Sequence, residues 1–166
     1  MSNQIRDEVS ITIERRVRDV FAYMDDVGRE HEWQPHLIEA DQTPPGPTRL
    51  GTRKRYVSQF LKKRLENTYE VVMIEPGERV VYQTTADSDL QAAVEITWEP
   101  AGKGTRVTMR IDGSIAGPLR MIPQKILERA RQSELEASLG RLKQVLESEG
   151  DVVTDTGTAV EPPPGR

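Results

Sequence analysis

The sequence contains no cysteine and only two histidines among its 166 residues. The absence of thiols excludes disulfides, thiolate metal sites and a cysteine nucleophile. No apolar run approaches the roughly 20 residues that a membrane-spanning helix needs. The N-terminal segment MSNQIRDEVS has no apolar core of the kind found in a signal peptide. We therefore expect a cytoplasmic protein without an integral membrane segment.

The sequence also lacks an excess of positive charge, because acidic residues outnumber basic ones and the formal net charge is −4. A polyanion partner is not favoured by that balance, and the chain has no glycine loop with phosphate-binding spacing. Basic residues do gather at 53–55 and 62–64. A solvated hairpin is the prediction for these two clusters, with an acidic membrane or nucleic acid as the alternative. We expect no nucleic-acid partner and no cofactor.

Apolar residues alternate with polar ones over residues 8–14, which indicates a strand with one buried face. From Val17 the spacing becomes helical, and this helix should end near Gly28. Residues 29–36 form a second short helix that Pro35 terminates. The remaining strand-like segments are 37–42, 52–61, 65–75, 79–85, 89–100 and 105–111. Turn sequences EPGE and AGKG separate some of them.

A long helix is predicted from Gln124 to Ser148. Leucines at 135, 139, 142 and 146 form one apolar stripe. The small residues Ala130, Ser133 and Ala137 interrupt the same side, so space beneath the helix is expected.

Residues 149–166 lack periodicity and are predicted to be a disordered tail after a single domain at 1–148.

This order of elements predicts an α+β fold, in which a curved seven-stranded antiparallel sheet surrounds a long C-terminal helix. The segments VFAYMDDVGREHEWQPHLIEA, LGTRKRY, YEVVMIEPGERVVYQT and VEITWEPAGKGTRVTMRI occur in that order before the helix. Together they resemble the START-like, or polyketide cyclase/dehydrase-like, superfamily over roughly residues 5–147. The resemblance implies a helix-grip fold with a cavity between sheet and helix. Members bind lipids, sterols or polyketides, and a minority catalyse cyclisation or dehydration.

The segment HEWQPH contains both histidines but does not predict a metal site. His31 and His36 are five residues apart, about 500° of helical rotation, and Pro35 interrupts the helix between them. No metal is expected, and both histidines should face solvent for the most part. The resemblance implies instead that Trp33 and Pro35 close one end of the cavity.

Polar residues on alternating strand positions are the better candidates for a binding site. Tyr56, Asn67, Tyr69 and Tyr82 would place hydroxyl and amide groups in an apolar chamber, which is how small-molecule sites orient a ligand. The alternative is that their polar ends face water, and a bulge would reverse the face. The full set of predicted ligand-binding residues is Trp33, Tyr56, Asn67, Tyr69, Tyr82, Val94, Met109, Ile122, Ile126 and Ala130.

Three functions remain open on the residues alone. The first is binding of a hydrophobic small molecule, such as a lipid or polyketide, between sheet and helix. The second is a polyketide cyclase or dehydratase that uses pocket tyrosines, although no catalytic residue can be assigned. The third is an interaction module that forms a homodimer through a sheet edge or the leucine stripe.

Overall fold

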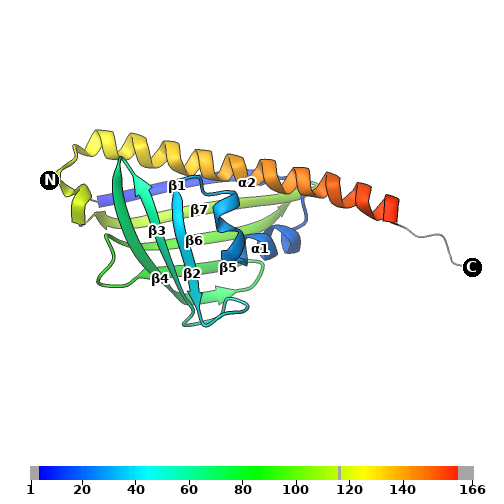
Figure 1. Cartoon of the computed structure of the whole chain (residues 1–166), viewed down its shortest axis with the longest axis horizontal. Coiled ribbons are helices and arrows are strands. Elements are labelled where there is room, and N and C mark those ends of the chain that lie inside the picture. Colours follow the sequence, from blue (N-terminus) through cyan, green and yellow to red (C-terminus); the bar gives the residue numbers. More distant parts are fainter. Residues whose placement is uncertain (1–3, 116, 161–166) are drawn as a thin grey trace, which may run out of the picture.

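The computed structural model describes residues 4–115 and 117–160, which form one curved antiparallel sheet and a long helix (Figure 1). The strands in chain order are β1 (Gln4–Ile13), β2 (Leu37–Thr43), β3 (Arg53–Phe60), β4 (Lys63–Glu75), β5 (Arg79–Thr84), β6 (Leu90–Ala101) and β7 (Gly104–Ile115). The helices are α1 (Val17–Asp25), η1 (Val27–Glu32), η2 (Gly117–Met121) and α2 (Gln124–Val160). The strand order β1-β7-β6-β5-β4-β3-β2 confirms the predicted fold class.

Tight turns join the sheet from β3 to β7 as a meander. Gly77 in EPGE and Gly102 in AGKG have φ of 77° and 60°, a left-handed conformation that glycine adopts without steric cost. The β3–β4 turn is different, because its two residues, Leu61 and Lys62, have φ of 50° and 65° without being glycine. All three predicted hairpins are present.

Helix α2 runs lengthwise along the curved sheet, and α1 and η1 lie on the same side of the sheet (Figure 1). Leu139, Leu142 and Leu146 are buried in one apolar cluster with Trp33 and Trp98, as the leucine stripe predicts. A second cluster near the start of α2 contains Ile5, Phe60, Leu65, Ile115, Leu119 and Leu127. No helix in the described residues is both long and apolar enough to cross a bilayer.

The inward face of α2 differs from the prediction. Ser133 and Ala137 are exposed, and Ser138 is buried instead. The reason is helical geometry: Ser138 lies three residues after Leu135 and four before Leu142, so it shares their face. Ile126 is 52% exposed and faces away from the sheet.

Several element boundaries also differ from the prediction. Strand β1 begins four residues before the predicted segment 8–14, and β7 ends four residues after the predicted segment 105–111. Helix α2 continues to Val160, beyond the predicted end at Ser148, and residues 161–166 of the predicted tail lie outside the described residues. The second short helix is a 3₁₀ helix that begins earlier, at Val27, because the Asp26 carboxylate accepts a hydrogen bond from the Gly28 N–H.

The β6–β7 pair leaves no room for a side chain at Gly113. A Cβ atom there would lie 2.1 Å from the Gln91 carbonyl oxygen and 2.5 Å from the Ala92 Cα. We expect Gly113→Ala to lower the free energy of unfolding by about 1–3 kcal/mol, measured by urea denaturation. Gly140→Ala is the control, since nothing lies within 4 Å of that position in α2. It should leave stability unchanged or raise it by up to about 1 kcal/mol.

Candidate functional site

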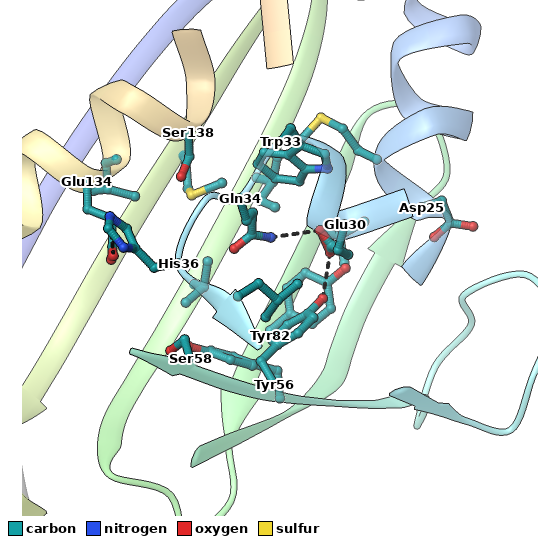
Figure 2. Close-up of a pocket in the computed structure, with 18 of the residues that line it drawn as sticks. Asp25, Glu30, Trp33, Gln34, His36, Tyr56, Ser58, Tyr82, Glu134 and Ser138 are labelled. Atoms are coloured by element: carbon teal, nitrogen blue, oxygen red, sulfur yellow. Dashed lines mark hydrogen bonds and ion pairs between the residues drawn. The ribbon is translucent and has the colours of Figure 1, made fainter. Parts of the chain in front are cut away.

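A cavity of about 170 Å³ lies between the sheet, the segment containing η1, and α2 (Figure 2). Most of its wall is apolar, and six of the eight aromatic residues of the chain line it. These six are Phe21, Trp33, Tyr56, Tyr69, Tyr82 and Trp98. A chain with few aromatic residues has therefore gathered most of them around one space.

Glu30 is a buried carboxylate at one side of this cavity, with only 4% of its surface exposed. Figure 2 shows Tyr56 and Gln34 converging on it. The Tyr56 hydroxyl donates to Oε1 at 2.7 Å, and the Gln34 amide donates to Oε2 at 2.7 Å. Burial raises the pKa of Glu30, while these donors and the charge of Lys54 act in the opposite direction.

Lys54 is the cation beside this carboxylate, and it is 1% exposed. Its Nζ lies 3.8 Å from Asp25 Oδ1 and 5.7 Å from the centroid of the Tyr82 ring. Burial lowers the pKa of Lys54, and the neighbouring Glu30 and Asp25 raise it. The prediction that the basic residues at 53–55 are all solvated is therefore wrong for Lys54. It shares the inward face of β3 with Tyr56, as the alternation along that strand already indicated.

Two cavity tyrosines have hydroxyls without a protein partner. Neither Tyr69 nor Tyr82 makes a side-chain hydrogen bond within the described part of the chain, although their rings pack 6.3 Å apart. Burial raises the pKa of both phenols, so they stay protonated at neutral pH. Ser58 and Ser138 add two further hydroxyls to the wall. The cavity thus offers several hydroxyl groups that can donate or accept hydrogen bonds.

His36 is exposed, as predicted, and it also lines the edge of the cavity. Its Nε2 lies 3.7 Å from Oε2 of Glu134 on α2, and the imidazole stays about half exposed. Burial raises the pKa of Glu134, and His36 opposes that shift. No third metal-ligating side chain joins them among residues 4–115 and 117–160.

A second cavity of about 140 Å³ adjoins the first and shares the lining residues Ser58, Glu134 and Leu135 with it. Its wall is mainly apolar, but Arg131 of α2 lies there and pairs with Asp7 of β1. Arg131 Nε donates to Asp7 Oδ2 at 2.7 Å, and both side chains are largely buried. This ion pair joins the middle of α2 to the first strand.

The predicted binding residues occupy several positions. Six line the first cavity: Trp33, Tyr56, Tyr69, Tyr82, Val94 and Met109. Asn67 lines the second cavity, and its Oδ1 accepts a hydrogen bond from the Leu90 N–H at 2.7 Å. Ile122 and Ala130 pack against the second apolar cluster without lining either cavity. Ile126 lies outside, on the exposed face of α2, so the structure does not place it at the site. A role in binding stays a prediction for all of them.

A curved seven-stranded antiparallel sheet that holds one long C-terminal helix defines the helix-grip, START-like class of proteins. A family model described as polyketide cyclase / dehydrase and lipid transport matches residues 4–147. The chain therefore belongs to that family. No curated protein matches the sequence significantly.

Solved structures with low sequence identity share the fold. A START superfamily protein from Mycobacterium smegmatis has a TM-score of 0.70 at 11% identity, over 86% of this chain and 97% of that one. A protein from Thermus thermophilus has a TM-score of 0.67 at 16% identity, over 88% of this chain and 98% of that one. The di-domain ARO/CYC StfQ from the steffimycin biosynthetic pathway has a TM-score of 0.70 at 15% identity, over 89% of this chain and 52% of StfQ.

Proposed function

We propose that the chain binds a hydrophobic small molecule, such as a lipid or a polyketide, in the cavity between the sheet and α2. The observation that supports this most is the apolar, aromatic wall combined with the hydroxyls of Tyr69 and Tyr82, which have no hydrogen-bond partner among the described residues. A few polar groups in an apolar pocket orient a ligand without weakening its burial. The family of the chain and its resemblance to an ARO/CYC protein point in the same direction.

The volume of the cavity limits the size of the ligand that it can hold. A closed apolar cavity of about 150 Å³ holds a benzene ring, so the first cavity, at about 170 Å³, suits a single ring or a similar group. A longer ligand would extend past Ser58 and Glu134 into the second cavity. The ligand is therefore expected to have either one compact apolar group or such a group with an apolar extension.

The direct test is displacement of an environment-sensitive fluorophore from the purified chain, together with native mass spectrometry after mild extraction. Saturable displacement by apolar ring compounds is the expected result. A chain that carries no extracted molecule and binds no apolar probe would contradict the proposal.

Tyr69→Phe and Tyr82→Phe should each weaken the binding of an oxygen-bearing ring compound by roughly fivefold, because one hydrogen bond contributes about 1 kcal/mol. Thermal stability should stay unchanged, since neither hydroxyl forms a hydrogen bond within the described residues. Tyr23→Phe is the control: its hydroxyl donates to Glu32 at 2.9 Å, and Tyr23 lines neither cavity. That variant should lose stability and keep its affinity.

The second candidate function is a cyclase or dehydratase, and the specific observation in its favour is the His36–Glu134 pair at the cavity. An imidazole beside a carboxylate can transfer a proton to or from a substrate, and a tyrosine hydroxyl can donate one. Turnover of a polyketide-type substrate that falls in His36→Gln while binding persists would support catalysis. Equal turnover in both proteins would exclude this role for His36.

A further inference from the structure

One end of the molecule exposes large apolar side chains. Met121, at the end of η2, is 90% exposed, and Ile126, in the first turn of α2, is 52% exposed. Leu61, in the β3–β4 turn, is 37% exposed. The β3–β4 turn and the start of α2 lie at the same end of the molecule in Figure 1. They are joined beneath the surface by Phe60, Leu65, Leu119 and Leu127.

Basic residues without an ion pair in the described part of the chain occur close to these apolar side chains. Five basic residues at this end form no ion pair within the described part of the chain: Lys62, Lys63, Arg120, Lys125 and Arg129. Segments 60–64 and 117–129 together contain six basic residues and a single acidic residue, Glu128, so positive charge is in excess at this end. This concentration of positive charge stands out on a chain whose net charge is −4.

The backbone of the β3–β4 turn supports a role for its side chains. Leu61 and Lys62 occupy the left-handed region, where a two-residue turn favours asparagine or glycine. A bulky residue in that region is uncommon and carries a conformational cost. Here the cost places one apolar and one basic side chain at the tip of a hairpin, and such strain is typical of functional positions.

We propose that this end, called the docking tip, binds an anionic lipid bilayer. Basic residues are attracted to acidic headgroups, and apolar side chains insert into the interfacial region. Nucleic acid would satisfy the cations but not the exposed Met121 and Ile126. The docking tip consists of Leu61, Lys62, Lys63, Arg120, Met121, Lys125, Ile126 and Arg129.

The docking tip adjoins the second cavity. Phe60 and Leu65, which flank the β3–β4 turn, line that cavity, as does Leu119 of η2. A docked molecule would therefore hold the apolar wall of the second cavity against the bilayer, where hydrophobic ligands dissolve. The docking tip consists of exposed residues and does not depend on the proposed ligand binding, for which the bilayer would be the source of ligand.

Vesicle flotation with the full chain tests the proposal. The chain should float with phosphatidylcholine vesicles that contain phosphatidylserine, should not float with phosphatidylcholine alone, and should dissociate at high salt. The double variant Lys62→Glu/Lys63→Glu should lower the partition coefficient by roughly twentyfold or more, since each basic residue contributes about fivefold. Met121→Gln should lower it several-fold without changing the charge of the tip.

Two matched controls carry the same chemical changes elsewhere. Leu50→Gln alters an exposed leucine in the loop before β3, and Lys103→Glu alters a lysine in the β6–β7 turn that forms no ion pair within the described residues. Both should float like the unmodified chain. Circular dichroism of every variant establishes that the fold is intact.

Two results would contradict the proposal that the docking tip binds an anionic bilayer. One is an unmodified chain that does not bind acidic vesicles, and the other is that the tip variants float as well as the controls. Salt-sensitive binding of duplex DNA that competes with vesicles and is unaffected by Met121→Gln would show a polyanion site instead. Fluorophore displacement without vesicles separates the two proposals. Tip variants should keep it, and its absence from the unmodified chain with flotation intact would overturn only the proposed ligand binding.

Discussion

Replacing Lys54 with methionine is expected to lower the free energy of unfolding by about 3–5 kcal/mol near pH 8, because it removes one partner of a buried charge cluster. Glu30 would keep its hydrogen bonds from Tyr56 and Gln34 but would lose the only cation beside it among the described residues. Asp25 would lose the Nζ group at 3.8 Å. Urea denaturation measures the effect.

The loss of stability in Lys54→Met should become smaller as the pH falls towards about 5. The direction of this pH dependence follows from the pKa of Glu30. Burial raises its pKa in the folded protein, and removing Lys54 raises that pKa further. A group with a raised folded pKa contributes stability that is fully present below its unfolded pKa and is lost as the pH rises through the folded pKa. The variant is therefore penalised most where Glu30 must be ionised, which is at high pH.

A double-mutant cycle isolates the charge effect. Lys54→Met combined with Glu30→Gln removes both charges and keeps an acceptor for Tyr56, so it should recover more than half of the loss. Lys63→Met, on the exposed start of β4, should have no effect. An equal loss at both pH values, without recovery in the double variant, would show that packing of the Lys54 side chain matters and its charge does not.

The sheet was predictable because its signals are local. Each strand alternates, and turns such as EPGE and AGKG mark where the chain reverses, so the meander follows from the sequence. The tyrosines at 56, 69 and 82 were placed on the correct face by the same alternation. Lys54 is in phase with Tyr56 too. Its burial was not predicted because lysine side chains are rarely buried.

Features that join distant segments were not predictable in this way. His36 lies beside Glu134 only because α2 packs over the end of η1. The spacing of residues along the sequence does not predict that contact. The face of α2 is a related case. Ser133 and Ala137 are as small as Ser138, and the flanking leucines decide which of the three points inward.

Filling the first cavity from α2 should abolish most ligand binding. Ser138→Phe places a ring where a small hydroxyl now lines the wall. Each ligand methylene that is kept out of an apolar site costs about 0.8 kcal/mol, so excluding three carbon atoms weakens binding roughly fiftyfold. Fluorophore titration measures the affinity, and the melting temperature shows that the variant folds.

Ser133→Phe is the matched control, because it introduces the same ring five residues earlier on the exposed face of the same helix. Its affinity should equal that of the unmodified chain. If both variants bind the probe equally well, the probe occupies some other surface, and the space between α2 and the sheet is not the binding site. If only Ser138→Phe loses affinity while it melts as a folded protein, the ligand lies between the tyrosines of the sheet and the middle of α2. There the hydroxyls of Tyr69 and Tyr82 have no hydrogen-bond partner in the described part of the chain.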